Sequence, residues 1–264
     1  MQYIGFAPEE GAFKGSRLQV KSIISHISCV QITPDTPNYI VVQYARVVAL
    51  LLMGGTMCLD SSENLVSPLY LAKLEDTVEA RNYSWGNAVL AFLYRELCNA
   101  STKSKATIGG ALQFVQIWVW SRIIPLCPRL GASRVHMGQH SIDNNRVFPA
   151  APYGTPYDME SDVIMAYPGN FNPQLWRSIG PLIFYVIVEM HYPEQVLRQF
   201  GMMPNIPDQP DIQDMSLHKI TRSNRTGTDW VLQHIHYITR WQRRYDTVIQ
   251  RQSISNRRDT DRGY

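Results

Sequence analysis

Paired cysteines are missing from this chain. It has 264 residues and four cysteines, and no two of them form a Cys-x-x-Cys motif. A secreted domain of this size more often carries a disulfide framework. The spacing therefore favours four reduced, mostly buried thiols in a reducing compartment. These cysteines are Cys29, Cys58, Cys98 and Cys127.

Long hydrophobic runs are also absent. The most apolar stretches are residues 39–53, interrupted by Arg46, and residues 181–188. Both are shorter than the roughly 18 apolar residues that span a bilayer. No charged start followed by an apolar run and a small-residue cleavage site marks a secretory signal. We therefore expect these stretches to be core helices, and we expect no membrane partner.

The usual catalytic motifs are missing as well. The chain has no GxGxxG, GxxxxGK[ST], GxSxG or HExxH motif. Two histidine pairs, His136 with His140 and His234 with His236, lack the further ligands of a zinc site. None of the six lysines lies in an apolar run that would lower its pKa for Schiff-base chemistry. We therefore expect no metal, no cofactor and no enzymatic activity.

One cluster of titratable residues resembles a general acid–base group. It consists of Glu189, His191 and Glu194. Glu189 and His191 are two residues apart, which puts them on different faces of a helix, and Pro193 marks a helix junction. A structural role is the better interpretation, with Glu194 in the first turn of the next helix, where its charge opposes the helix dipole.

Helical periodicity dominates what the sequence does contain. Apolar residues recur at helical spacing in at least six segments, and no segment alternates over the length of a strand. The predicted fold class is therefore mainly α, a multi-helix globular domain with few or no short strands. The predicted helices are residues 38–52 ending at Gly54 and Gly55, residues 85–98 capped by Ser84, a helix from Thr107 through Val119, residues 172–191 with a kink at Pro181, residues 193–200, and residues 228–250. Residues 129–172 and 203–214 are predicted loops, the first with one short strand.

Positive charge gathers near the C-terminus. Residues 215–264 contain 10 Lys or Arg against 4 Asp or Glu, a net charge of +6, whereas the whole chain carries +3. The spacing lets several arginines share one face of the last helix, beside aromatic residues, which suits phosphate backbones. A solvated helix end favoured by its dipole is an equally good interpretation. The arginines are Arg240, Arg243, Arg244, Arg251, Arg257 and Arg258.

The tryptophans admit two interpretations. Trp118, Trp120, Trp176, Trp230 and Trp241 are possible stacking platforms for nucleic-acid bases. At helical spacing, however, tryptophans are more often core anchors, and we favour that role for them. Trp85, Trp118 and Trp176 in particular are predicted to be largely buried.

Several blocks of residues along the chain follow one another in an order and at a spacing that resemble those of a known family. They include Tyr44, Arg46, Gly54, Gly55, Trp85, Gly86, Gly109, Gly110, Trp118, Trp120, Trp176, Glu189, His191, Arg198, Trp230 and Trp241. In this order the blocks resemble the plant mobile domain family, over residues 13–248. The resemblance implies a domain at residues 13–250, shortened at its N-terminus, followed by a basic, disordered tail at residues 251–264.

The resemblance also implies a biological setting. Such domains occur in transposons and in nuclear host proteins that silence transposons and maintain genome integrity in meristems. Some are fused to, or act with, a phosphatase of the metallophosphoesterase type, whose GDxHG and GNHE motifs this chain lacks. The family is sometimes labelled aminotransferase-like, but the residues supply no cofactor lysine and no phosphate cradle.

Three functional hypotheses follow. The first is a nuclear interaction module that docks a protein partner, with nucleic-acid contact through the basic tail. The second is a direct DNA-binding protein that uses the basic C-terminal helix, which a steep salt dependence of binding would distinguish. The third and least supported is a cofactor-dependent transferase, which an absorbance band of bound pyridoxal phosphate would support.

Overall fold

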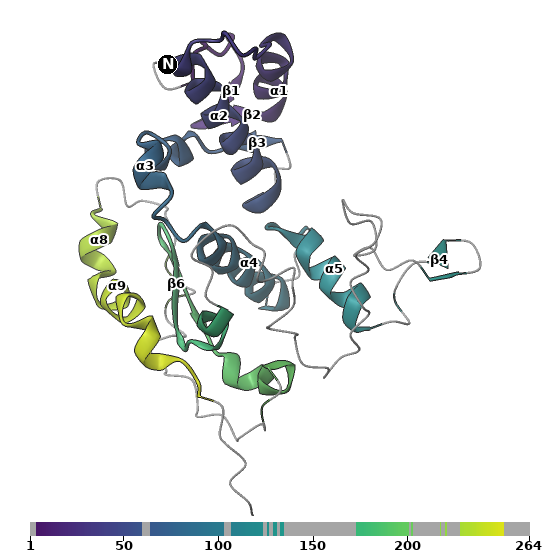
Figure 1. The fold of residues 1–264 in the computed structure, drawn as a ribbon, viewed down its shortest axis with the longest axis vertical. Coiled ribbons are helices and arrows are strands. Elements are labelled where there is room, and N and C mark those ends of the chain that lie inside the picture. The colour runs from purple at the N-terminus through teal and green to yellow at the C-terminus, as the bar shows by residue number, and fades with distance from the viewer. Residues whose placement is uncertain are drawn as a thin grey trace, which may run out of the picture. The chain divides into compact units, whose positions relative to one another are not determined.

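The structure is a computed structural model. It describes residues 4–59, 64–102, 107–123, 173–200 and 228–250, together with residues 126, 129–130, 133–134, 202, 217 and 220. The chain forms two compact units, which we call unit 1 (residues 1–115 and 183–187) and unit 2 (residues 116–182 and 188–264). Figure 1 shows their elements.

The fold is mainly α-helical, which confirms the predicted class; the described strands are two to five residues long. Up to residue 122 the elements are β1 (Phe13–Lys14), β2 (Arg17–Gln19), α1 (Val20–Cys29), α2 (Asn38–Leu52), η1 (Met53–Met57), β3 (Leu65–Val66), η2 (Pro68–Lys73), α3 (Thr77–Ala80), α4 (Trp85–Thr102) and α5 (Leu112–Arg122). Beyond it they are β4 (Arg129–Leu130), β5 (Ser133–Arg134), η5 (Pro173–Arg177), β6 (Gly180–Phe184), β7 (Ile187–His191), η6 (Pro193–Phe200), α8 (Trp230–Gln233), α9 (Ile235–Gln242) and η7 (Arg244–Thr247).

The core of unit 1 lies between a small sheet and the helices α1 and α2. Strand β2 pairs antiparallel with β1 and β3, and Leu18 stands opposite both Phe13 and Val66. Helix α1 contacts α2 and β2. The side chains that these elements enclose are at most 1% exposed, so they form a dry apolar centre: Leu18, Ile23, Val47, Leu50 and Val66.

Helix α2 has the predicted bounds, but it does not end at Gly54 and Gly55 as predicted. It continues into η1, a π-helical turn. A Cβ atom on Gly54 would lie 2.2 Å from Cγ1 of Val66, so only glycine lets this turn approach β3. Glycine therefore serves close packing here, and the cap interpretation was wrong.

The extension changes the length of the apolar helical stretch. Residues Asn38–Met57 form a 20-residue helix of mean hydropathy 1.6, which is long and apolar enough to cross a membrane by length and composition alone. This corrects the expectation that the run is too short. A core helix passes the same test, and this one supplies Val47 and Leu50 to the core of unit 1. In its middle, Arg46 donates hydrogen bonds to the carbonyl oxygens of Leu74 and Glu75.

A second glycine pair explains why α5 begins later than predicted. Gly110 has a φ of +91°, which favours glycine, and its N–H donates to the carbonyl of Leu59 at 2.7 Å. The N–H of Gly109 donates to Oε2 of Glu96 at 3.2 Å. The turn lies where the sequence predicted the first residues of the helix, so the helix cannot begin at Thr107. Helix α4, by contrast, begins at Trp85 as predicted.

None of the three cysteines that the structure describes forms a disulfide, but not all of them are buried. Cys29 and Cys98 are exposed, which corrects the expectation of mostly buried thiols. Cys58 is buried, and burial raises the pKa of its thiol to about 12. Cys127 lies outside the described residues. The Cys58 thiol therefore stays protonated at neutral pH, consistent with a packing role.

The predicted helix over residues 172–191 was wrong. Only the short turn η5 is helical there, and β6 and β7 form a two-stranded sheet joined by Tyr185 and Val186. Aromatic and β-branched residues fill this stretch, and they favour strands. Tyr185 adopts a φ of 53°, and its hydroxyl donates to the carbonyl of Leu69 at 2.9 Å. A short apolar run fits a strand as well as a helix, so its period alone was ambiguous.

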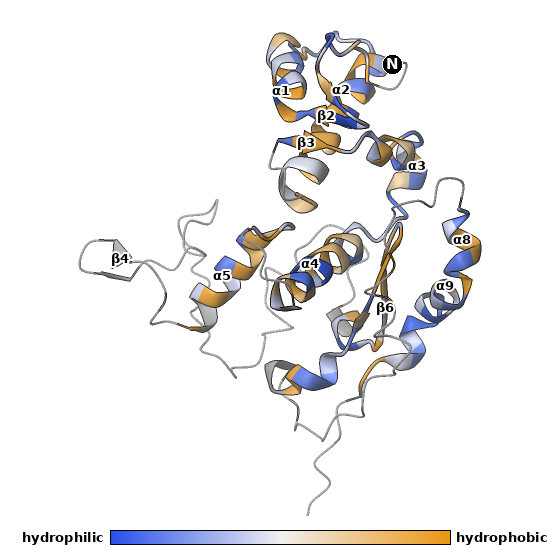
Figure 2. Cartoon of the chain, turned by 180° about the vertical axis from the view of Figure 1, so that it is seen from behind, coloured by the Kyte–Doolittle hydropathy of each residue, from blue (hydrophilic) through white to orange (hydrophobic). Residues whose placement is uncertain are grey.

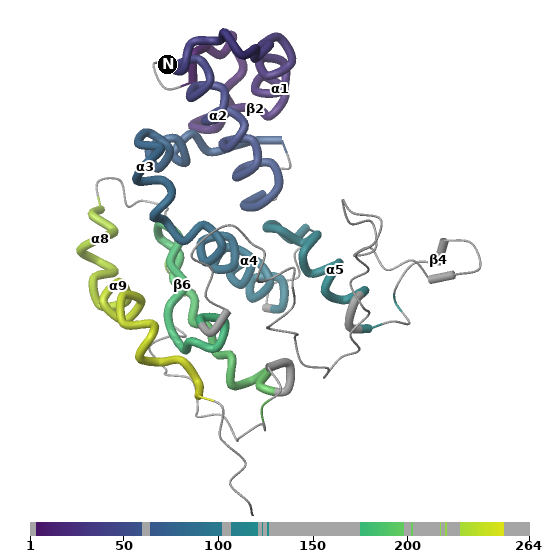
Figure 3. The backbone as a smooth tube through the Cα atoms, in the orientation of Figure 1, coloured from purple at the N-terminus to yellow at the C-terminus, as the bar shows by residue number. Residues whose placement is uncertain are grey.

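The final segment is also broken where one long helix was predicted. Helices α8 and α9 are separated by His234 (φ −103°, ψ 12°), and Arg243 (φ −91°, ψ 18°) separates α9 from η7. Figure 3 traces this segment as successive short turns. We call residues 228–250 the C-terminal segment. By contrast, η6 has the predicted bounds, Pro193–Phe200.

Candidate interaction site in the C-terminal segment

The C-terminal segment begins with a side-chain N-cap, formed by Asp229. The Asp229 carboxylate accepts hydrogen bonds from the N–H groups of Val231 (2.9 Å) and Leu232 (3.2 Å). These donors would otherwise have no partner within the helix, and an Asp at this position is a strong N-cap. The cap therefore sets the direction of α8.

The inner side of the segment is aromatic. His234 is 1% exposed, and its ring stacks on that of Trp230 at 5.6 Å and meets the Tyr237 ring edge-on at 6.3 Å. Trp241, one helical turn beyond Tyr237, is half-buried. This face anchors the segment, so His234 is a packing residue and not one of an exposed metal-binding pair.

At its other end the segment pairs with the chain that precedes β6. Val248 forms an antiparallel bridge with Ser178. The N–H of Ile179 donates to the Thr247 carbonyl at 3.1 Å, and the N–H of Ile249 donates to the Arg177 carbonyl at 3.0 Å. These bonds join two parts of unit 2 that are far apart in the sequence.

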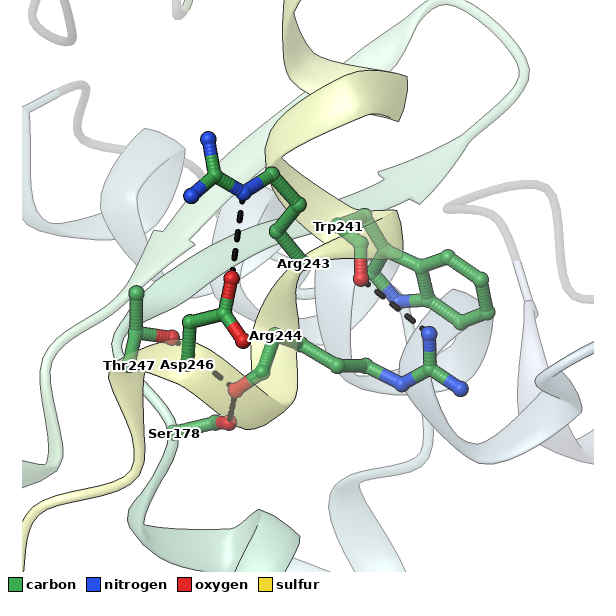
Figure 4. A network of polar contacts seen from close by, with 6 residues as sticks. All are labelled: Ser178, Trp241, Arg243, Arg244, Asp246 and Thr247. Carbon is green, nitrogen blue, oxygen red and sulfur yellow. Dashed lines mark hydrogen bonds and ion pairs between the residues drawn. The ribbon is translucent and has the colours of Figure 1, made fainter.

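Ser178 reinforces this join. It is 8% exposed, and its Oγ donates a hydrogen bond to the Arg244 carbonyl, which also accepts one from Oγ1 of Thr247 at 3.0 Å. Figure 4 shows the two hydroxyl groups converging on that carbonyl oxygen. No periodic pattern or motif predicts the role of Ser178, because the contact is between residues 66 positions apart.

The Arg244 side chain belongs to the same network. Its Nη1 donates to the Trp241 carbonyl at 3.1 Å. Its Cζ lies 3.8 Å from the centre of the Trp241 ring and 4.9 Å from that of Tyr245. A guanidinium over an aromatic face is a cation–π contact. The half-buried Arg244 therefore contacts its own chain and is not positioned as a free phosphate ligand.

Arg243 has the opposite environment. Its Nε binds Oδ2 of Asp246 at 3.0 Å, and the two side chains are 74% and 60% exposed. In Figure 4 its two Nη atoms point away from Asp246. Arg240 is half-buried in α9. The predicted single Arg face is therefore split by the break at Arg243; Arg251, Arg257 and Arg258 lie outside the described residues.

The suspected acid–base cluster has structural contacts. Nε2 of His191 lies 3.1 Å from the Trp176 carbonyl, and burial lowers the pKa of His191, while that hydrogen bond and the Glu194 carboxylate oppose the change. Glu189 is 4% exposed, and Glu194 lies in the first turn of η6, where the sequence placed it. His191 thus ties the end of β7 to η5.

Two side-chain polar atoms near this tie have no hydrogen-bond partner among the described residues. They are Nε of Arg177 and Oε2 of Glu194, and both are buried. Nη1 of Arg177 lies 4.0 Å from the Met202 sulfur.

Among the described residues no group of three His, Cys, Asp or Glu side chains is placed to hold a metal ion. His136 and His140 lie outside those residues. Trp85, Trp118, Trp120, Trp176 and Trp230 are half-buried, and Nε1 of Trp85 donates to the Ala80 carbonyl at 2.7 Å. Trp85, Trp118 and Trp176 are therefore less buried than predicted, although half-burial still fits core anchors better than free stacking platforms. Gly86 is exposed in α4, and Arg198 lies in η6.

The outer side of the C-terminal segment is exposed and apolar, and the sequence did not lead us to predict this surface. Val231, Leu232 and Ile235 are 60%, 70% and 53% exposed. Figure 2 shows apolar stretches along α8 and α9 among hydrophilic ones. The sequence did contain a hint of this exposed surface. Apolar residues fall on both sides of the short helix α8, and a single buried face can cover only one of those sides.

These features define a mainly helical domain whose described polar clusters hold the fold together. Its sequence identifies the class: the plant mobile domain family model matches residues 2–264, and the chain belongs to that family. No solved structure matches it.

Three relatives from Arabidopsis thaliana are similar to the chain. "Serine/threonine-protein phosphatase 7 long form homolog" is 30% identical over 82% of this chain and 18% of its own length. "Protein MAINTENANCE OF MERISTEMS" is 30% identical over 62% of this chain and 37% of its own length. "Protein MAIN-LIKE 2" is 27% identical over 94% and 39%, respectively. The chain therefore spans less than half of each of these relatives.

Proposed function

We propose that this chain is a non-enzymatic, nuclear interaction module that docks a protein partner through its C-terminal segment. The observation that carries the proposal is the build of that segment. Its aromatic inner side and the Ser178–Arg244 network hold it in place, while Leu232 and Arg243 on its outer side remain exposed. A fixed element that leaves apolar and charged side chains exposed suits protein recognition.

The relatives support a particular setting. One has a name that identifies it as a phosphatase homologue, and another has a name that refers to maintenance of meristems. We propose a partner of the metallophosphoesterase type, within a nuclear complex that acts in transposon silencing and genome maintenance. The chain itself lacks the GDxHG and GNHE motifs, so it would contribute docking and the partner would contribute catalysis.

Capture from nuclei tests the proposal. The full chain, carrying an affinity tag, is incubated with plant nuclear extract with and without nuclease, and bound proteins are identified by mass spectrometry. We expect a phosphatase of this type to be enriched over a tag-only control and to remain after nuclease treatment. Loss of every specific protein on nuclease treatment would overturn the proposal.

A second candidate function is direct nucleic-acid binding. It is favoured by the exposed Arg243 guanidinium and by the net charge of +6 over residues 215–264. Under this alternative, DNA affinity falls steeply with salt, and each lost phosphate contact lowers the salt slope by about one. Comparing Arg240→Gln/Arg243→Gln with the unchanged chain measures this. An equal and shallow slope in both proteins would eliminate the alternative.

A further inference from the structure

Three exposed apolar side chains mark the start of the C-terminal segment. Val231, Leu232 and Ile235 are each more than half exposed. Val231 and Ile235 are four residues apart across His234, and the backbone hydrogen bond from Ile238 N–H to the His234 carbonyl (2.9 Å) carries the helix on into α9. Contiguous apolar exposure of this kind marks an interaction site more often than single surface residues do.

The patch is held rigid from both ends. Asp229 caps the helix at the N–H groups of Val231 and Leu232. On the inner side the buried His234 stacks on Trp230, so the outer side chains cannot rotate inward. A partner therefore meets a preorganised surface and loses little entropy in ordering it.

The same face becomes basic farther along. Leu232, His236, Thr239 and Arg243 follow one another at helical spacing, and all four are exposed. Arg243 follows Leu232 by 11 residues, with a break in the helix at His234 and the end of α9 before Arg243. The Asp246 carboxylate pairs with Nε of Arg243, and a guanidinium has further N–H donors on its Nη atoms. The face is therefore apolar at one end and able to bind a carboxylate at the other.

From this pattern we propose that the outer face of the C-terminal segment binds an acidic, amphipathic helix of a protein partner. The inference rests on the proposed docking function and names its surface and chemistry. Apolar side chains of the partner cover Val231, Leu232 and Ile235, and an Asp or Glu beyond them on the same partner helix binds Arg243. A polybasic or polar occupant would leave the apolar end uncovered.

Charge and chemistry separate this occupant from two others. A second copy of the chain would bring two regions of net charge +6 together, and like charges across an interface oppose association. DNA would contact Arg243, but nucleic-acid interfaces are polar and strongly charged, so DNA would leave the three apolar side chains without a partner. An acidic amphipathic helix satisfies both ends.

Selection from a phage-displayed library of helical peptides with random charge and apolar positions tests the proposal on the full chain. We expect enriched peptides to carry Leu, Ile or Phe on one face and an Asp or Glu beyond these apolar positions. Peptides without acidic enrichment would overturn the proposal, and so would failure of any peptide to enrich.

Matched variants then locate the binding. Leu232→Ser should weaken the best peptide by about tenfold or more, as loss of an apolar anchor does, and Arg243→Gln should weaken it as well. Val78→Ser is the control, because Val78 is 68% exposed on α3 of unit 1, against 70% for Leu232. Circular dichroism checks that each variant keeps its helices. Equal peptide affinity in the Leu232 and Val78 variants would overturn the assignment.

The two proposals fail separately. If Leu232→Ser still captures the nuclear partner at the unchanged level, docking stands and this surface is wrong. If the full chain captures no nuclear protein, the docking function itself is wrong. Displacement of the selected peptide by duplex DNA, with full binding retained in Leu232→Ser, would show a nucleic-acid site and overturn the inference.

Discussion

Two adjacent arginines show how differently the fold uses the same residue type. Arg244 lies over the Trp241 ring and donates to the Trp241 carbonyl, whereas Arg243 is 74% exposed and forms an ion pair with the exposed Asp246. We predict that Arg244→Gln lowers the free energy of unfolding by about 1–2 kcal/mol, through loss of the cation–π contact and a hydrogen bond. Arg243→Gln should change it by less than about 0.5 kcal/mol, because exposed ion pairs contribute little.

Urea unfolding of both variants, followed by tryptophan fluorescence, measures this difference. Equal unfolding free energies for the two variants would show that the Trp241 contact does not stabilise unit 2. The sequence placed both arginines near aromatic residues, but spacing alone did not tell which of them the chain retains for its own packing.

His191 predicts a pH dependence of stability. Burial lowers the pKa of His191 below its ordinary 6.5, so the unfolded chain takes up a proton at a higher pH than the folded chain does. Stability contributed by neutral His191 is therefore present above about pH 6.5 and is lost as the pH falls from there toward the lowered pKa.

Unfolding free energies at pH 7.5 and pH 5.5 test this for the unchanged chain and for His191→Gln. The unchanged chain should lose more stability on acidification than the variant, because Gln does not titrate. The same loss in both proteins would place the pH dependence on other groups and contradict this role for His191.

At the scale of elements, Gly54, in the turn η1 that follows α2, has a packing role that can be measured. A Cβ on Gly54 would lie 2.2 Å from the Val66 side chain, so Gly54→Ala should destabilise the chain by about 1–3 kcal/mol. Val66→Ala in the same protein should return part of that loss. Gly86→Ala is the control: nothing lies within 4 Å of its Cβ position in α4, and alanine should stabilise by up to about 1 kcal/mol.

Thermal and urea unfolding provide the comparison. If Gly54→Ala and Gly86→Ala had the same stability, close approach of η1 to β3 would not be the reason for glycine at position 54. A double mutant no more stable than Gly54→Ala alone would point to the same conclusion.

Helix prediction succeeded where periodicity was long or a proline marked the start. The bounds of α2, the start of α4 and the bounds of η6 were predicted correctly, although η6 is broken at Val196. It failed at β6 and β7, where tertiary pairing overrode a short apolar run, and at His234 and Arg243, where the last helix breaks. The join at Ser178 depends on residues 66 positions apart, which no local pattern reveals.

At the scale of the molecule, family membership and site chemistry contribute differently. The blocks that carry the family resemblance include structural devices: Arg46 holds the turn after η2, Gly54 packs on Val66, and His191 ties β7 to η5. A family defined by such residues shares a fold, and its function depends on the surfaces that the fold exposes. In unit 2 the outer face of the C-terminal segment is the surface that we assign to docking.

Site-specific photo-crosslinking tests this central claim most directly. A benzophenone amino acid is placed at the exposed Gln242 in one protein and at Val78, which is 68% exposed, in another. Both are irradiated in nuclease-treated plant nuclear extract, and covalent adducts are identified by mass spectrometry. The account predicts a specific protein adduct from position 242 and none from position 78; adducts from position 78 alone, or the same adducts from both positions, would contradict it.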